Sequence, residues 1–182
     1  MGFIKSGLFI SLDGVIESPE EWHFPYFDDQ MGATVGALMS DSDATLVGRQ
    51  TYDEFAAYWP QADANDPMTA VMNGARKYVV SSTVTNPEWE NTTAINPDDD
   101  DVDAQLTRLK ADTRISTTGS ATLVRWMLEH GLVDELHLLV HPVVVGSGKR
   151  LFTDGTKVPL TLVSSTTFTT GVLHVVYAPA AP

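Results

Sequence analysis

The stretch "RISTTGSATLVRWMLEHGLVDELHLLVHPVVV", residues 114–145, predicts a strand, a helix and a second strand in succession. Residues 113–117 are expected to form a short strand. Residues 120–131 carry apolar side chains at helical spacing. Gly131 is typical of the position that follows the last turn of a helix. Residues 134–145 form a second apolar, β-branched run, whose strand we expect to end near Pro142. A strand, a helix and a strand in this order indicate an α/β fold with parallel strands.

The rest of the chain extends this alternation on both sides. We expect further strands over 3–12, 44–48 and 76–82, helices over 26–40, 49–59 and 98–112, two antiparallel strands within 159–179 joined around Thr170 and Gly171, and loops over 60–68, 86–98 and 146–158. The sequence therefore predicts one α/β domain over residues 1–182. Its sheet is mostly parallel, with an antiparallel C-terminal edge.

Composition narrows the class of partner. The chain has 182 residues and a net charge of −13, from 24 acidic and 11 basic side chains. Such a surface repels nucleic acid, although local donors can still bind a small anion. No apolar run reaches the roughly 18 residues of a membrane-spanning helix, so no membrane partner is expected. The absence of cysteine excludes disulfides and thiolate metal sites and fits a cytoplasmic protein.

Three strand-to-helix junctions are rich in small and polar residues. Ligands of α/β sheets bind at the carboxyl ends of parallel strands, where helix N-termini present free N–H groups to anions. Ordinary turn chemistry would explain any one junction alone. Together they predict a phosphate-binding site of a nucleotide cofactor. The first junction holds Gly48, Arg49 and Thr51, the second Ser81 and Ser82, and the third Gly119 and Ser120.

Other motifs point away from familiar sites. The chain lacks the G-x-G-x-x-G pattern, and residues 143–150, "VVVGSGKR", miss both the first glycine and the final Ser or Thr of a P-loop. The acidic run 98–101 lacks the spacing of a calcium loop and is typical of a helix N-terminus. His137 and His141 would lie roughly 13 Å apart on a strand, too far to share one ion. We expect no metal.

Four segments resemble a known family. They are "SLDGVI" (11–16), "LVGRQTYDEF" (46–55), "VVSST" (79–83) and "TGSATLVRWMLEHGLVDELHLLVHPVVVGSGKRLF" (118–152). In this order they resemble the dihydrofolate-reductase-like superfamily, in particular the reductase domain of the bifunctional riboflavin-biosynthesis deaminase/reductase and its stand-alone relatives. The resemblance implies a dihydrofolate-reductase-like, three-layer α/β fold with a mostly parallel central sheet and antiparallel C-terminal strands. It also implies reduction with NADPH.

The same resemblance implies which residues contact the cofactor. Its phosphates would lie along the first junction and on the N-terminus of the helix that follows the third, with the adenosine phosphate end near the second. The implied residues are Gly48, Arg49, Thr51, Ser81, Ser82, Gly119, Ser120, Ala121 and Thr122. Arg49 favours NADPH over NADH, because a 2′-phosphate needs a cationic partner.

Candidates for the chemistry and for substrate binding lie near the N-terminus. Asp13 stands at the expected mouth of the site, and Asp28 opens the first helix, where relatives carry an acid. Their alternatives are an Asp-Gly turn and a helix N-terminus. Trp22 and Phe27 would wall an aromatic substrate, or pack in the core. Tyr52 would stack near the cofactor, or simply pack.

These observations leave two functions open. The first is an NADPH-dependent reductase of a small heterocycle, such as the pyrimidine intermediate of riboflavin synthesis or a pterin. The second is a nucleotide-binding or dimeric interaction module without turnover. We also expect a homodimer through the strand at 134–145 and the C-terminal strands. Lys149 and Arg150 are candidates for contacts with a substrate phosphate, but the shortage of basic residues favours an uncharged substrate.

Overall fold

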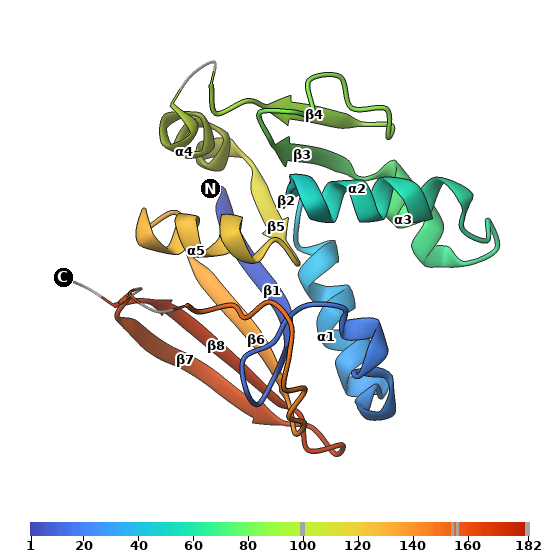
Figure 1. Cartoon of the computed structure of the whole chain (residues 1–182), viewed down its shortest axis with the longest axis vertical. Coiled ribbons are helices and arrows are strands. Elements are labelled where there is room, and N and C mark those ends of the chain that lie inside the picture. The colour runs from blue at the N-terminus through green and yellow to red at the C-terminus, as the bar shows by residue number, and fades with distance from the viewer. Residues whose placement is uncertain (99–100, 154, 156, 181–182) are drawn as a thin grey trace.

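The computed structural model describes residues 1–98, 101–153, 155 and 157–180. These residues form an eight-stranded sheet with helices on both of its faces (Figure 1). The strands are β1 (Phe3–Ser11), β2 (Ala44–Gly48), β3 (Arg76–Val80), β4 (Thr92–Ile95), β5 (Arg114–Thr117), β6 (Glu135–His141), β7 (Leu160–Thr167) and β8 (Leu173–Pro179). The helices are α1 (Asp29–Ser40), α2 (Arg49–Tyr58), α3 (Pro67–Gly74), α4 (Val102–Asp112) and α5 (Ala121–Glu129).

The strand order is β4-β3-β2-β5-β1-β6-β8-β7. The strands from β4 to β6 are parallel, while β8 pairs antiparallel with both β6 and β7. This confirms the expected mostly parallel sheet with an antiparallel C-terminal pair. The three junctions noted in the sequence follow β2, β3 and β5. Because β2 lies between β3 and β5, these junctions leave neighbouring strands at the same edge of the sheet.

The two faces of the sheet have separate cores. On one face α4 and α5 cover the centre of the sheet, where Leu123 and Val124 pack in the same cluster as Ile4 and Leu8 (Figure 1). On the other face α1 contributes Met31, packed with Leu139 and partly buried Phe9. Within the described residues, no helix is both long enough and apolar enough to cross a bilayer.

Two expected loops contain regular structure. Residues 92–95, inside the expected loop 86–98, form β4 and extend the sheet beside β3. The loop expected over 60–68 ends where α3 begins at Pro67, with Asp66 as its N-cap accepting from Met68 N. The element β4 is only four residues long and α3 only eight, so neither repeats its pattern often enough to show in the sequence.

Two helices begin later than expected, and one strand ends where expected. The helix expected over 26–40 begins at Asp29, because Phe24–Tyr26 form a 3₁₀ turn. The helix expected from residue 98 begins at Val102; residues 99–100 of that expectation lie outside the described residues. The strand expected within 134–145 and ending near Pro142 ends at His141, as predicted, because Pro142 has no N–H to donate to the sheet.

Candidate functional site

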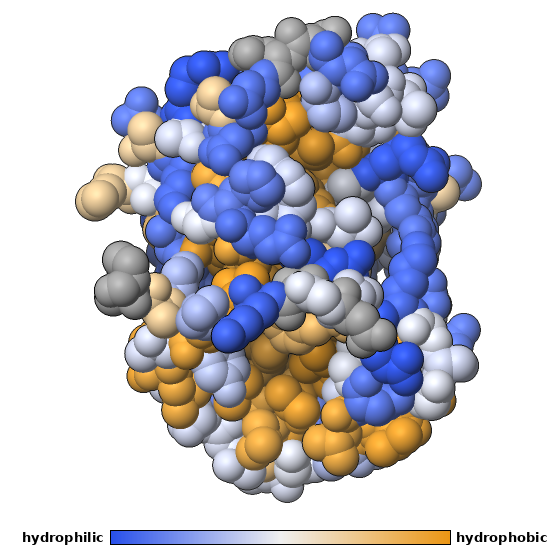
Figure 2. Space-filling model, turned by 60° about the vertical axis from the view of Figure 1, so that its left-hand side comes forward, coloured by the Kyte–Doolittle hydropathy of each residue, from blue (hydrophilic) through white to orange (hydrophobic). Residues whose placement is uncertain are grey.

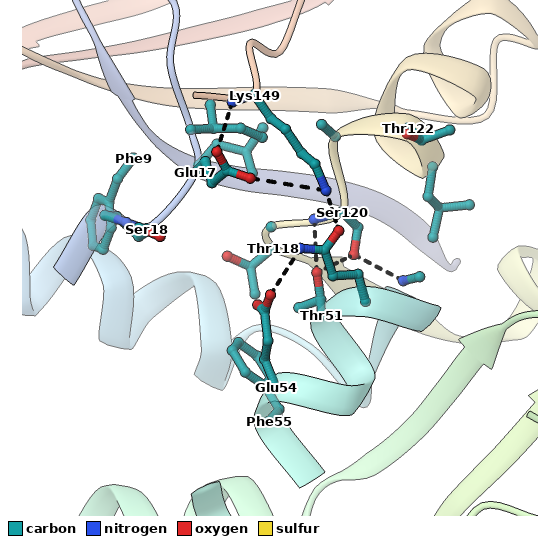
Figure 3. A pocket seen from close by; sticks show the side chains of 18 of the residues that line it. Phe9, Glu17, Ser18, Thr51, Glu54, Phe55, Thr118, Ser120, Thr122 and Lys149 are labelled. Carbon is teal, nitrogen blue, oxygen red and sulfur yellow. Dashed lines mark hydrogen bonds and ion pairs between the residues drawn. The ribbon is translucent and has the colours of Figure 1, made fainter. Parts of the chain in front are cut away.

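A cavity of about 900 Å³ lies where α2 and α5 begin, at the carboxyl ends of β2 and β5 (Figure 3). Its volume falls within the range of about 300–1,000 Å³ typical of small-molecule sites. Its walls come from the end of β2 and the start of α2, from residues 118–123, from β1 and residues 16–20, and from Lys149. The position is the one expected for a ligand site in an α/β sheet.

A hydrogen-bonded lock joins the two helix starts. Thr51 Oγ1 on α2 accepts hydrogen bonds from the backbone N–H of Ser120 at 3.0 Å and from its hydroxyl at 2.9 Å. Ser120 Oγ in turn accepts from the backbone N–H of Gly48 at 2.9 Å. Thr51 and Ser120 are 69 residues apart in the chain. This lock, formed by Gly48, Thr51 and Ser120, fixes the relative position of the two helix N-termini (Figure 3).

Two consecutive residues before α5 adopt left-handed backbone conformations. Gly119 has φ +59°, and a Cβ there would stand 2.9 Å from Thr51 Oγ1, so the site requires glycine. Ser120 has φ 48° as well. A non-glycine residue in this conformation costs on the order of 1–3 kcal/mol and persists only where its surroundings hold it. The lock supplies that restraint on Ser120.

The first turns of both helices leave N–H groups free of a side-chain cap. Gly48 has no side chain, and the Ser120 hydroxyl is turned to Gly48 and Thr51 instead of capping α5. Free N–H groups and the positive end of the helix dipole attract anions. A Cβ on Gly48 would lie 3.6 Å from the nearest atom, so this glycine is not needed for packing. It leaves room in the cavity instead, and the arrangement fits a phosphate group.

Charged residues on the cavity wall are linked to one another. The Lys149 ammonium contacts Gln50 Oε1 and lies 4.0 Å from Glu17 Oε1. Gln50 Nε2 donates to Glu54 Oε1 at 3.0 Å, so the chain of contacts crosses the cavity mouth (Figure 3). Arg49 pairs with Asp53 at 2.8 Å on an exposed part of α2.

Aromatic rings form another part of the wall. Phe55, Tyr58 and Trp59 come from α2 and the turn after it, and Phe9 comes from β1. Their place in the cavity wall was not expected from the sequence. The first three recur at helical spacing, which is a usable signal for one helix face, but nothing in the sequence tells whether that face meets a core or a cavity.

Most of the expected cofactor residues come together here. Those that line the cavity are Gly48, Arg49, Thr51, Gly119, Ser120, Ala121 and Thr122. The residues expected at the second junction do not line it. Ser81 Oγ accepts hydrogen bonds from the N–H groups of Thr83 and Val84 at 3.1 and 3.0 Å, closing its own turn, and Ser82 is exposed.

Asp13 lies outside the lining and holds a loop. Its carboxylate accepts hydrogen bonds from the Ser11 hydroxyl at 2.7 Å and from the N–H groups of Val145 and Gly146 at 3.0 and 2.9 Å. These bonds hold the pKa of Asp13 well below its ordinary value. Arg150 adds a bond to Asp13 O at 2.9 Å. The carboxylate thereby fastens the loop after β6 to the end of β1.

The other expected acid, Asp28, is the N-cap of α1. Its Oδ1 accepts from Met31 N at 2.9 Å and its Oδ2 accepts from the Thr169 hydroxyl at 3.0 Å. This geometry matches the alternative reading of a helix N-terminus.

The expected substrate-contacting rings also lie outside the lining. Trp22 is buried, and its indole N–H donates to Glu17 O at 3.1 Å. Phe27 is exposed, and its ring centroid lies 5.9 Å from that of His23 at an interplanar angle of 74°. Tyr52 is buried beside Trp89, and its hydroxyl accepts a hydrogen bond from the backbone N–H of Trp89 at 3.3 Å. Tyr52 therefore packs in a hydrophobic cluster with Trp89 and does not line the cavity.

The two histidines of β6 have separate environments. His137 Nδ1 lies 3.0 Å from His174 Nε2, and its Nε2 lies 3.0 Å from Glu135. His141 is fully buried, and its Nδ1 lies 2.8 Å from Leu139 O. Among the residues that the structure describes, no group of three or more His, Asp or Glu could hold a metal ion.

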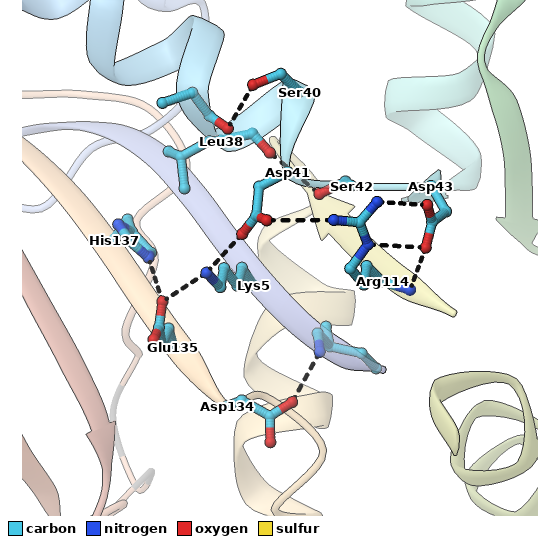
Figure 4. A network of polar contacts seen from close by, with 12 residues as sticks. Lys5, Leu38, Ser40, Asp41, Ser42, Asp43, Arg114, Asp134, Glu135 and His137 are labelled. Atoms are coloured by element: carbon cyan, nitrogen blue, oxygen red, sulfur yellow. Dashed lines mark hydrogen bonds and ion pairs between the residues drawn. The ribbon is translucent and has the colours of Figure 1, made fainter. Parts of the chain in front are cut away.

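Glu135 also belongs to a polar network that crosses the amino ends of the parallel strands, away from the cavity (Figure 4). Lys5 bridges Glu135 at 3.2 Å and Asp41 at 2.9 Å. Arg114 extends the network from Asp41 to Asp43, with which it pairs at 2.8 Å. The pairing with Arg114 lowers the pKa of Asp43 to about 2. The network ties β1, β5 and β6 to the end of α1.

Comparison with known proteins supports the fold and shows the family. The family model described as "RibD C-terminal domain" matches residues 3–174. The chain is 33% identical over 178 residues to the uncharacterized protein YyaP of Bacillus subtilis, covering 93% of this chain and 91% of that protein.

Solved structures match over nearly the whole chain. A putative riboflavin biosynthesis protein from Shewanella sp. PV-4 has a TM-score of 0.78 at 18% identity, with all of both chains covered. A pyrimidine reductase-like protein from Corynebacterium diphtheriae has a TM-score of 0.70 at 15% identity, covering 100% of this chain and 93% of that one. The diaminohydroxyphosphoribosylaminopyrimidine deaminase/5-amino-6-(5-phosphoribosylamino)uracil reductase of Thermotoga maritima has a TM-score of 0.69 at 16% identity, covering 98% of this chain and 57% of that one.

At these identities the structures establish the fold alone, and they confirm the dihydrofolate-reductase-like α/β class expected from the sequence. The match to the family model shows which family the chain belongs to, because it covers residues 3–174, from the start of β1 into β8. This chain belongs to the RibD C-terminal domain family.

Proposed function

We propose that the protein is an NADPH-dependent reductase that transfers a hydride to a small heterocyclic substrate. Membership in the RibD C-terminal domain family supports a reductase-like role. One observation carries the proposal. The N-termini of α2 and α5 are hydrogen-bonded to each other, and both line a cavity of about 900 Å³ together with Gly48 and Gly119. The substrate classes we favour are a pyrimidine of the riboflavin pathway and a pterin-like compound.

The residues of the two junctions would hold the phosphates of NADPH. The first-turn N–H groups of α5, from Ala121 and Thr122, would donate to the diphosphate beside Gly48. Arg49 would contact the 2′-phosphate. Its present partner is the exposed Asp53, and a surface pair of this kind contributes only about 0.2–1 kcal/mol, so the guanidinium is free to turn to a stronger anion.

When bound, NADPH supplies the hydride, and the chain's part is to position the rings and exclude water. Phe9, Phe55 and Tyr58 would flank the rings on the open side of the cavity. For Asp13 or Asp28 to deliver the proton, its carboxylate would have to give up the backbone hydrogen bonds described above. We therefore leave the proton donor unassigned.

Thermal unfolding with NADPH, with NADH and without a nucleotide tests the proposal. A ligand at 100 times its dissociation constant stabilises the fold by about 2.7 kcal/mol. We expect a clear rise of the melting temperature with NADPH and a smaller rise with NADH. Arg49→Ala should shrink the rise with NADPH; Arg76→Ala, which removes an exposed arginine from β3, is the matched control.

Gly48→Ala separates binding from folding. The added methyl group finds ordinary packing distances in the protein, so the unliganded melting temperature should stay nearly unchanged. The same methyl group fills space at the helix N-termini, so NADPH should bind at least about tenfold more weakly, or about 1.4 kcal/mol. An unchanged melting temperature of the wild-type protein with both nucleotides would reject the proposal.

A separate observation favours self-association of the protein. Self-association is also part of the alternative function, a dimeric interaction module. Residues 160–179 contain no Asp, Glu, Lys or Arg in a chain of net charge −13. Leu162 and Val163 of β7 and Leu173 of β8 are exposed, and Figure 2 shows an apolar area on the lower part of this side. We propose that two copies pair through this uncharged surface. Sedimentation equilibrium should show a dimer that Leu162→Asp dissociates; a wild-type monomer would contradict it.

A further inference from the structure

The charges around the cavity restrict which substrate it accepts. Its lining holds three carboxylates, from Glu17, Glu20 and Glu54, against two cations, from Arg49 and Lys149. Glu54 stands next to Phe55 on α2, and Glu17 and Glu20 stand on the segment after β1, while Arg49 lies at the start of α2 in the first junction. The wall that faces a substrate is therefore acidic and aromatic.

Lys149 is held in place by its neighbours. Its backbone N–H donates to Glu17 Oε2 at 3.1 Å, while its ammonium lies near the other oxygen of the same carboxylate and contacts Gln50. The segment carrying it is fastened by the β-bridge between Val15 and Arg150. Lys149 thus partly offsets the charge of Glu17, and a substrate phosphate would have to compete with that carboxylate for the ammonium.

Basic residues just outside the wall are also engaged. Arg150 donates to Asp13 O at 2.9 Å, and Arg125 donates to the backbone oxygens of Arg150 and Leu151 at 3.0 and 3.1 Å. His23 stacks behind Phe9 with ring centroids 4.6 Å apart, where burial and the neighbouring His141 lower its pKa. His23 is therefore neutral at pH 7. Among the described residues of the lining, no third cation is present.

NADPH would make this shortage of cations more severe. The cofactor carries three phosphates, which would take up Arg49 and the helix N-termini. A further phosphate in the same cavity would have to share Lys149 with Glu17, and it would face both the cofactor phosphates and the carboxylates of Glu20 and Glu54. Like charges at such distances repel, although exposed carboxylates are partly screened by salt.

We propose that the substrate is an aromatic heterocycle without a phosphate ester, held by ring contacts with Phe9 and the aromatic face of α2. This inference rests on the proposed reductase function and narrows its substrate class. Exposed Glu20 and Glu54 would accept hydrogen bonds from ring amino groups. The uracil named for the Thermotoga maritima enzyme is a phosphoribosylamino compound, so the site would differ from that enzyme in the group it accepts.

A matched pair of probes tests the substrate class directly. The probes are 5-amino-6-(5-phosphoribosylamino)uracil and the same compound without its phosphate, each titrated calorimetrically at low and at high salt into the protein loaded with NADP⁺, which has the same phosphates as NADPH but cannot reduce the probe. We expect the unphosphorylated compound to bind at least tenfold more tightly at low salt. The preference should shrink as salt is raised, because screening weakens the repulsion of the phosphate.

Charge variants show whether the lining causes the preference. The double variant E20Q/E54Q should reduce the preference for the unphosphorylated compound at least threefold, because the phosphorylated compound then binds more tightly. The double variant E88Q/E129Q removes the same number of exposed charges outside the lining and should leave the preference unchanged.

Each remaining outcome decides against the inference. Equal or tighter binding of the phosphorylated compound would overturn it. Failure of both compounds to bind, while NADPH still raises the melting temperature, would overturn it and leave the cofactor proposal standing. No stabilisation by NADPH would remove the reductase proposal and this inference with it.

Discussion

The junction after β3 and the paired junctions after β2 and β5 look alike in sequence but differ in structure. All three end in small, polar residues. After β2 and β5 the chain enters a helix directly, and the two helix starts are joined through Thr51 and Ser120. After β3 the chain enters no helix, and Ser81 satisfies the N–H groups of its own turn. Small polar residues after a strand can therefore close a turn as readily as they can precede a helix N-terminus, and only the latter presents free N–H groups to an anion.

The largest expected effect is at Gly119. In Gly119→Ala the new Cβ would lie 2.9 Å from Thr51 Oγ1, at a φ of +59°. We expect a loss of about 2–4 kcal/mol in the free energy of unfolding, from left-handed strain and the clash together, measured by urea denaturation.

Gly131→Ala is the matched control for that substitution. Gly131 has a similar φ of +66°, but nothing lies within 4 Å of its Cβ position. It should lose only the conformational part, about 1 kcal/mol. Equal losses in the two variants would show that the contact with Thr51 contributes nothing.

A smaller effect is expected at Thr51. Thr51→Val keeps the shape of the side chain but removes the acceptor of the Ser120 N–H, so we expect a loss of about 1–3 kcal/mol and weaker NADPH binding. Thr34→Val, at a half-buried position on α1 where the lost hydrogen bond to Gln30 O is exposed to solvent, should cost about 0.5 kcal/mol or less and leave NADPH binding intact. Urea denaturation measures the free energy of unfolding of both variants, and titration measures their affinity for NADPH. If Thr51→Val changes neither quantity, the hydrogen bonds between Thr51 and Ser120 do not contribute to either.

The smallest effect is expected at the junction after β3. Ser81→Ala removes the acceptor of two turn N–H groups and should cost about 1 kcal/mol of stability, with NADPH affinity unchanged. Fluorescence titration with NADPH checks this. A marked fall in affinity would mean that Ser81 contacts the cofactor as the resemblance implied, and the contrast between the junctions would disappear.

Local pattern explains which parts were predictable. The alternation of strands and helices and the glycine before α5 depend on residues close together in the chain, so each leaves a signal in the sequence. Short β4 and α3 left none. Asp28 could be read from its place before a helix, but the carboxylate of Asp13 bonds to residues more than 130 positions away, which no local pattern reveals.

The sequence by itself determined the α/β class, the order of the elements and the two glycine-containing junctions, because periodicity and turn preferences act over a few residues. Only the tertiary structure decided that β2 lies between β3 and β5, that Thr51 meets Ser120, and that the aromatic face of α2 opens on a cavity. The physical reason is that strand order and side-chain contacts arise from packing between segments distant in the chain. Residues of the same type can then line a cavity at one junction and close a turn at the next.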